Sequence, residues 1–122
     1  MPKVMVIEDD PTMRSLLVSL FEIEGFRVAQ ADYHQPIDQV VEFILEEHPD
    51  VLLLDLKLGN LSGLDLLSRL HQFDSGKDIR VLISSGRDAS HECIQAGADD
   101  FIMKPFMPDE LIAKIHELSG KQ

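Results

Sequence analysis

Short apolar runs alternate along the chain with longer segments whose apolar residues recur every three or four positions. Four runs, at residues 3–7, 51–54, 80–84 and 101–103, are almost wholly apolar, and a fifth, at 26–31, is partly polar. Near-continuous apolar runs are typical of strands buried on both faces of a parallel sheet, whereas a partly polar run suits an edge strand. The VLLL run at 51–54 is the most apolar, so we expect it at the centre of the sheet.

The intervening segments predict five helices. The first begins at Pro11 after a capping Asp10 and ends at Gly25, and the second follows Pro36 and stops at His48. The other three are expected over residues 64–70, 90–96 and 108–118, with a loop at 57–63 and a polar connector at 74–78. Strands separated by helices of this size require right-handed crossovers. The predicted fold class is therefore α/β, a doubly wound five-stranded parallel sheet with helices on both faces.

Length and charge narrow the class of protein. The chain fits one domain, residues 1–122, which is long enough to bury a core unaided. Its 22 acidic residues outnumber 11 Lys and Arg to give a net charge of −11, and no basic patch is present for direct nucleic-acid binding. The single cysteine, Cys93, precludes an internal disulfide. Because no segment resembles a signal peptide or a membrane span, we expect a cytoplasmic location without membrane contact.

Polar groups follow three of the apolar runs directly. Glu8 and Asp9 follow the first, Asp55 follows VLLL, and Lys104 follows the last. A parallel α/β sheet binds its ligands just outside the carboxyl ends of its strands, so we expect these groups to meet at one edge. Three crowded carboxylates repel one another unless a cation or a proton joins them. Mg²⁺, which prefers oxygen ligands, is the expected cofactor, and the lysine could hold a further anion.

Four stretches, in this order, resemble the receiver domain of two-component response regulators. They are VMVIEDDPTMR, PDVLLLDLKLGNLSGLDLL, VLISSG and AGADDFIMKPF, and together they span nearly the whole chain. The resemblance implies a flavodoxin-like (βα)5 receiver fold. It also implies that the domain accepts a phosphoryl group from a partner phosphohistidine with Mg²⁺, and that this switches its surface to control an output domain or a partner protein.

The resemblance implies a phosphoacceptor and a set of metal ligands. Asp55 stands at the phosphoacceptor position, and Glu8 and Asp9 stand where the family keeps its metal-binding acidic pair. Lys57, two residues after the acceptor, falls at the position whose backbone carbonyl binds the metal. The metal set implied in this way is Glu8, Asp9, Asp55 and Lys57.

Further positions surround the expected phosphoryl group. By the resemblance, Ser85 supplies a hydroxyl to a phosphoryl oxygen, Lys104 bridges the acceptor and the phosphoryl group, and Gly86 leaves the group room. Pro105 follows the lysine where the family carries a cis peptide bond. A carboxylate attacks a negatively charged phosphoryl group only slowly, so charge on the transferring oxygens must be cancelled. Mg²⁺, Lys104 and Ser85 would do this from different sides.

The implied protein is a signalling phosphoacceptor that assists its own phosphotransfer and dephosphorylation, and not an enzyme. A sensor histidine kinase or a histidine phosphotransfer protein is the expected donor, and an output domain or a homodimer partner the expected target. Glu8 and Phe101 replace the commoner aspartate and tyrosine of the family. Lys57 and Arg87 are long basic residues, and the resemblance implies that both point over the mouth of the site. We expect these two cations to slow self-dephosphorylation.

Two other functions remain open at this point. A pseudo-receiver would bind its partner without phosphorylation, and only failed labelling could identify it. A phosphatase of the haloacid-dehalogenase type also phosphorylates a strand-end aspartate, but it needs a second acid where this chain has Lys57. We interpret Asp10 as a helix cap, Cys93 as a small buried residue and the five histidines as surface or packing residues.

Overall fold

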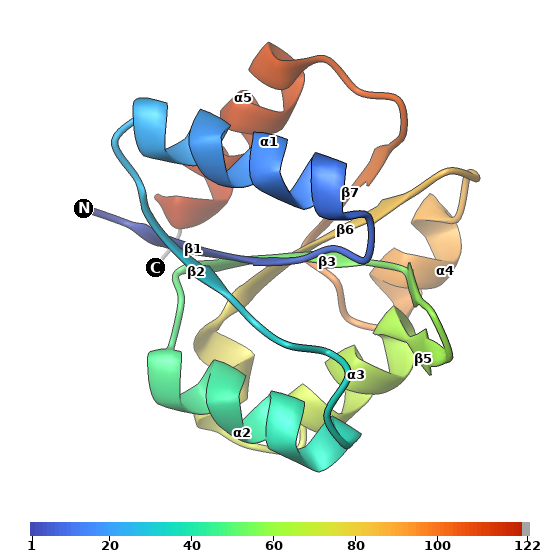
Figure 1. Ribbon diagram of the computed structural model, residues 1–122. Coiled ribbons are helices and arrows are strands. Elements are labelled where there is room, and N and C mark those ends of the chain that lie inside the picture. Colours follow the sequence, from blue (N-terminus) through green and yellow to red (C-terminus); the bar gives the residue numbers. More distant parts are fainter. Residues whose placement is uncertain (121–122) are drawn as a thin grey trace.

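The computed structural model describes residues 1–120. Its centre is a parallel five-stranded sheet with strand order β2-β1-β3-β6-β7, and helices cover both faces (Figure 1). The strands are β1 (Lys3–Ile7), β2 (Arg27–Gln30), β3 (Val51–Asp55), β6 (Arg80–Ser85) and β7 (Asp100–Met103). The predicted doubly wound α/β fold is confirmed, with the VLLL run in the central strand and the partly polar run at an edge.

The helices divide between the two faces of the sheet. They are α1 (Pro11–Ile23), α2 (Ile37–Glu47), α3 (Gly63–Leu70), α4 (Ser90–Gln95) and α5 (Pro108–Ser119). Helices α1 and α5 cover one face, and α2, α3 and α4 cover the other (Figure 1). Alternate residues of β1 serve the two cores: Val4 and Val6 pack under α1 and α5, and Met5 and Ile7 pack on the opposite side. No helix in residues 1–120 is long and apolar enough to span a membrane.

The ends of the first two helices follow the predicted signals. Oδ1 of Asp10 accepts hydrogen bonds from the backbone N–H groups of Thr12 (2.9 Å) and Met13 (3.3 Å), so its role as a cap is confirmed. Gly25 has φ of 92° just after α1, and His48 ends α2 with φ of 44°, in the left-handed region. The predicted stops at these two positions are therefore confirmed.

The segment at 57–63, predicted as a loop, contains a small antiparallel ribbon and the start of α3. Its strands are β4 (Lys57–Leu58) and β5 (Leu61–Ser62), which join through a turn at Gly59 with φ of 59°. Leu58 is fully buried and anchors the ribbon to the core. Two-residue strands are too short to produce a periodic signal, which explains why the pattern of the sequence did not predict them. The predicted connector at 74–78 likewise contains a 3₁₀ helix, η1 (Ser75–Asp78).

The strand register brings the carboxyl ends of four strands to one edge. Ile7 pairs with Leu54, Asp55 pairs with Ser84, and Ser85 pairs with Met103. The residues directly after β1 and β7 therefore lie at about the level of the last residues of β3 and β6. This alignment places the polar groups singled out in the sequence within reach of one another.

Candidate functional site

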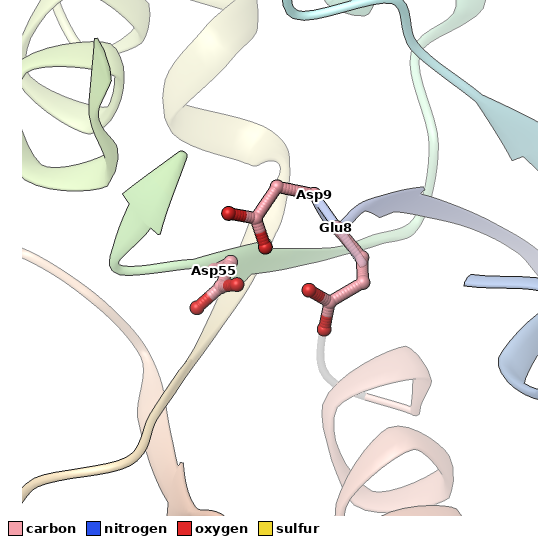
Figure 2. A group of neighbouring side chains, drawn as sticks. All are labelled: Glu8, Asp9 and Asp55. Carbon is pink, nitrogen blue, oxygen red and sulfur yellow. The ribbon is translucent and has the colours of Figure 1, made fainter. Parts of the chain in front are cut away.

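Three carboxylates gather where β1 and β3 end. One oxygen from each of Glu8, Asp9 and Asp55 lies within 4.8 Å of the others, and Figure 2 shows the three side chains converging from the two strand ends. Glu8 and Asp55 are buried, with only 3% and 7% of their surfaces exposed. Hard oxygen ligands at this spacing fit a divalent cation such as Mg²⁺. The arrangement predicted for these three residues is therefore present in the structure.

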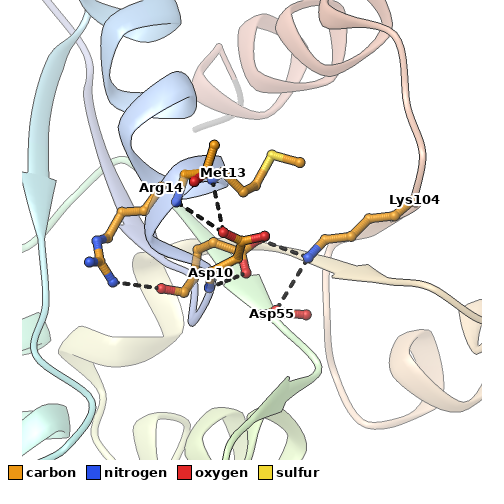
Figure 3. Close-up of polar contacts among 7 residues, drawn as sticks. Asp10, Met13, Arg14, Asp55 and Lys104 are labelled. Atoms are coloured by element: carbon orange, nitrogen blue, oxygen red, sulfur yellow. Dashed lines mark hydrogen bonds and ion pairs between the residues drawn. The ribbon is translucent and has the colours of Figure 1, made fainter.

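Lys104 provides the positive charge beside this cluster. Its Nζ donates a 2.8 Å hydrogen bond to Oε1 of Glu8 and a 3.3 Å bond to Oδ2 of Asp55 (Figure 3). The backbone N–H of Lys104 donates to the carbonyl oxygen of Ser85 at 2.7 Å, which ties the end of β7 to the end of β6. The peptide bond to Pro105 is cis, as predicted. The lysine thus contacts both the expected acceptor, Asp55, and one member of the acidic pair, Glu8.

The loop after β1 is fixed around Glu8 by two contacts from α1 and its cap. The backbone N–H of Asp10 donates to Oε2 of Glu8 at 3.2 Å, and the guanidinium of Arg14 donates to the carbonyl oxygen of Glu8 at 3.2 Å (Figure 3). The contact from Arg14 was not predicted from the sequence. Its only signal was its position one helical turn after the cap, where a long side chain can reach back to the strand end.

Burial and the neighbouring charges set the protonation of the cluster. Burial, reinforced by the Glu8 carboxylate and partly opposed by Lys104, raises the pKa of Asp55 to about 7. Burial also disfavours the ionised form of Glu8, but hydrogen bonds from Lys104, Asp55 and the Asp10 N–H outweigh it and lower the pKa of Glu8. Burial alone would lower the pKa of Lys104, but its contacts with the two carboxylates raise it. When no cation is bound, the cluster therefore tends to keep one proton on Asp55 near neutral pH.

A cavity of about 610 Å³ opens beside Asp55. Its lining residues include Lys57, Ser85, Gly86 and Arg87. Ser85, the last residue of β6, is 6% exposed, and its Oγ accepts a 3.2 Å hydrogen bond from the backbone N–H of Arg87. A Cβ added at Gly86 would have no heavy atom within 4 Å, so the space beside this residue is open. The structure thus groups the predicted hydroxyl, the small residue and the expected acceptor around one cavity.

Gly63 supports the acceptor strand, a role that the sequence analysis missed. Its N–H donates a 2.7 Å hydrogen bond to the carbonyl oxygen of Leu56. A Cβ at this position would lie 2.5 Å from the carbonyl oxygen of Asp55 and 3.1 Å from the Cα of Leu56. A side chain there would therefore displace the backbone that carries Asp55. A glycine at the start of a helix gave no sign of this in the sequence, because the contact is with a residue eight positions earlier.

Other residues considered in the sequence lie outside this cluster. Cys93 is fully buried in α4, and burial raises the pKa of its thiol, in agreement with a packing role. Phe101 is partly buried and packs against the core beneath α2, α3 and α4. Within residues 1–120, no histidine belongs to the group of carboxylates able to hold a metal ion.

Comparisons with known proteins agree with this geometry. Residues 4–116 match the response regulator receiver domain family. Over 116 residues the chain is 32% identical to the phosphate regulon transcriptional regulatory protein PhoB of Escherichia coli (strain K12) and 35% identical to the DNA-binding response regulator MtrA of Mycolicibacterium smegmatis. Each alignment covers 93% of this chain but 49% of PhoB and 48% of MtrA. The chain thus spans about half the length of the curated relatives it matches.

Solved structures show the same fold. The receiver domain of the Francisella response regulator 1452 superposes with a TM-score of 0.85 at 29% identity, covering 98% of this chain and 97% of that one. The receiver domain of the sensor histidine kinase PA1611 from Pseudomonas aeruginosa PAO1, which has a magnesium ion coordinated in its active-site cleft, gives 0.84 at 23% identity, with 98% of each chain covered. On its sequence and its fold together, the chain belongs to the family of response regulator receiver domains.

Proposed function

We propose that the chain accepts a phosphoryl group on Asp55 from a phosphohistidine of a partner protein, with Mg²⁺ as cofactor. The observation that carries this proposal is the meeting of four charged groups at one sheet edge. The carboxylates of Glu8, Asp9 and Asp55 converge within 4.8 Å, and Lys104 donates hydrogen bonds to two of them. A cation and a lysine at an aspartate are what phosphoryl transfer to a carboxylate requires.

The same carboxylates, with the backbone carbonyl of Lys57, would hold the metal ion. The spacing of the three carboxylate oxygens supports this assignment, and Lys57 lines the cavity beside Asp55. The receiver domain of PA1611, whose fold this chain shares, carries a magnesium ion in its cleft. Bound here, Mg²⁺ would neutralise charge on the oxygens of the incoming phosphoryl group.

With Mg²⁺ bound, side chains of the protein would carry out the transfer. A carboxylate oxygen of Asp55 attacks the phosphorus, the bond from phosphorus to the imidazole nitrogen breaks, and its electron pair stays on the histidine, which takes up a proton. Lys104 and the hydroxyl of Ser85 donate hydrogen bonds to the transferring oxygens. In the later hydrolysis, a water oxygen attacks the phosphorus, the bond from phosphorus to the Asp55 oxygen breaks, and its electron pair restores the carboxylate. Inorganic phosphate leaves, and the proton lost by the attacking water passes to solvent or to the phosphate. The protein would thus be a signalling phosphoacceptor that assists both steps.

The donor would be a sensor histidine kinase or a histidine phosphotransfer protein. Phosphorylation would switch the surface of the domain, and that surface would control an output domain, a partner protein or a second copy of the chain. PhoB, named a transcriptional regulatory protein, and MtrA, named a DNA-binding response regulator, are about twice as long as this chain, which leaves room in such proteins for an output domain. We propose a cytoplasmic site of action, without direct binding of nucleic acid or membrane by this domain.

Labelling with a small phosphodonor tests the proposal. Incubation with acetyl phosphate and Mg²⁺, followed by intact mass measurement, should show one added phosphoryl group. The group should be absent in Asp55→Asn and strongly reduced by a chelator. Equal labelling of Asp55→Asn would place the phosphoryl group elsewhere and refute the assignment. Failure of the unaltered protein to accept the group from acetyl phosphate or from a phosphohistidine donor would favour a phosphorylation-independent binding module.

A further inference from the structure

An ion pair between Arg87 and Glu92 forms part of the wall of the cavity beside Asp55. Nη2 of Arg87 lies 3.2 Å from Oε1 of Glu92, and both residues line the cavity together with Asp55 and Ser85. The pair connects the loop that follows β6 to the first turn of α4. The chemistry proposed above does not use it.

This ion pair is weak enough to be exchanged for another partner. The two side chains are 64% and 51% exposed, and a single contact between a nitrogen and an oxygen joins them. Exposed pairs of this kind stabilise a protein only slightly. A phosphoryl group on Asp55 would bring about two negative charges into the same cavity, and a guanidinium binds such a group through paired hydrogen bonds. The phosphoryl group would therefore compete well with Glu92 for Arg87.

The backbone of Arg87 is already connected to the expected phosphoryl site. Its N–H donates the 3.2 Å hydrogen bond to Oγ of Ser85. The intervening Gly86 has open space on the side where a Cβ would stand. A shift of Ser85 towards a phosphoryl oxygen would draw Arg87 in the same direction.

Helix α4 is built to respond to the loss of this pair. It has only six residues, and its cap residue, Ala89, makes no side-chain hydrogen bond, so the side-chain contact to its first N–H group is a 3.3 Å bond from the backbone N–H of Ser90 to Oδ1 of Asp88. Buried Cys93 and Ala89 anchor it to the core, whereas Glu92 lies in its first turn and faces the cavity. Once Glu92 loses its cation, its carboxylate is left beside the added phosphoryl charge, and repulsion favours movement of the helix away from the cavity.

We propose that phosphorylation makes Arg87 exchange Glu92 for the phosphoryl group on Asp55, and that this exchange transmits the signal to α4. The inference rests on the function proposed above. It adds Arg87 as a residue that binds the phosphoryl group, and Glu92 as the carboxylate that binds Arg87 before phosphorylation. In the resting protein Glu92 keeps Arg87 at the rim of the cavity. In the phosphorylated protein Arg87 binds the phosphoryl oxygens and Glu92 is released.

A double-mutant cycle with a phosphoryl mimic tests the exchange. Beryllofluoride with Mg²⁺ is titrated into the unaltered protein, Arg87→Gln, Glu92→Gln and the double variant, and amide NMR signals report on α4. Glu92→Gln should bind the mimic about twofold to fivefold more tightly, because an exposed pair no longer has to be broken. Arg87→Gln should bind it more weakly, and its α4 signals should respond little. Asp38→Asn breaks the exposed Arg69–Asp38 pair, neither member of which lines the cavity. It is the matched control and should change neither the affinity for the mimic nor the response of the α4 signals.

The cycle also separates this inference from the function on which it rests. An equal gain from Glu92→Gln in the Arg87→Gln background would mean simple charge repulsion and would overturn the exchange. Binding of the mimic by the unaltered protein with motionless α4 signals would overturn the exchange alone. No Mg²⁺-dependent binding of the mimic by the unaltered protein, together with no labelling of Asp55, would overturn both proposals.

Discussion

Lys104 forms a short ion pair with the buried Glu8: its Nζ donates a 2.8 Å hydrogen bond to Oε1 of a carboxylate that is 3% exposed. The bond from the same ammonium to Asp55 is longer, at 3.3 Å. The additional methylene of a glutamate, compared with an aspartate, lets the carboxylate extend to the lysine. Lys104 therefore interacts more strongly with Glu8 than with Asp55. Burial keeps the pKa of Asp55 high, at about 7.

This distribution of charge predicts a pH dependence of the metal-free fold. Asp55 binds its proton more tightly in the folded protein than in the unfolded chain, because its pKa rises from 3.8 to about 7. Its contribution to stability is thus largest at low pH and is lost as the pH rises towards 7. In chelator, the free energy of unfolding of the unaltered protein should fall relative to Asp55→Asn between about pH 5 and pH 7, by up to about 1.4 kcal/mol per pH unit.

Urea unfolding at several pH values measures this difference in the free energy of unfolding. With Mg²⁺ present, the unaltered protein should instead gain stability relative to Asp55→Asn as the pH rises. Binding of the cation requires the ionised carboxylate, so Mg²⁺ affinity should increase as the pH rises through 7. A constant difference between Asp55→Asn and the unaltered protein across this range would show that Asp55 titrates at its ordinary pKa.

Removing Asp9 should weaken the metal site without weakening the fold. Asp9→Ala deletes one of three converging carboxylates, so Mg²⁺ should bind more weakly while repulsion within the cluster decreases. We expect its stability in chelator to stay the same or to increase. Thermal unfolding with and without Mg²⁺ measures both effects.

The neighbouring Asp10 provides the matched control. Asp10→Ala removes the cap of α1 and should cost about 1 kcal/mol in stability while leaving the response to Mg²⁺ largely intact. A loss of stability in Asp9→Ala comparable to truncation of a core residue would show that Asp9 is a structural hydrogen-bonding group.

Gly63→Ala should impair the site by displacing the backbone that carries Asp55. A helix normally gains up to about 1 kcal/mol when glycine is replaced by alanine. Here the added Cβ would lie 2.5 Å from the carbonyl oxygen of Asp55, and such overpacking costs about 1–3 kcal/mol, so the clash should outweigh the gain. The variant should be less stable and should be phosphorylated more slowly at Asp55.

Gly86→Ala controls for the effect of alanine itself, because its Cβ would have no heavy atom within 4 Å. Its free energy of unfolding should be nearly unchanged. If Gly63→Ala proved as stable as the unaltered protein and was labelled at the same rate, the close approach of Gly63 would have no role in positioning Asp55.

The sequence predicts most of the fold and the centre of the site because both depend on strand ends. Apolar runs mark the strands, and Glu8, Asp55 and Lys104 each follow or end one, so their meeting follows from a parallel sheet. The ribbon formed by β4 and β5 was not predicted, because its two-residue strands are too short to show an alternation of apolar and polar residues. Its place in the fold depends on burial of Leu58, which is a tertiary effect.

Contacts between elements that do not involve the strand ends alone could not be predicted from the pattern. The bond from Arg14 to the carbonyl oxygen of Glu8 and the close approach of Gly63 to Asp55 join residues whose types are ordinary at their positions. The Arg87–Glu92 pair likewise depends on how the loop after β6 turns into α4. For the same reason, the sequence indicated Arg87 at the mouth of the site but not the carboxylate that holds it.

The two cations at the mouth of the cavity should prolong the life of the aspartyl phosphate. Lys57 and Arg87 both line the cavity beside Asp55, where they can attract the phosphoryl oxygens and hinder the in-line water that hydrolysis needs. Neither side chain can accept a proton from that water. Replacing both residues by alanine should therefore accelerate loss of the phosphoryl group, followed by intact mass after removal of the donor.

The structure predicts that the two cations act unequally before phosphorylation. Arg87 begins paired with Glu92, whereas no ion pair of the Lys57 ammonium occurs within residues 1–120. Glu92→Gln should accordingly slow the loss of the phosphoryl group, because Arg87 no longer has a competing carboxylate. Asp38→Asn, which frees an arginine that does not line the cavity, should leave the rate unchanged. A double alanine variant that loses the phosphoryl group at the original rate, or more slowly, would show that the cations do not shield it.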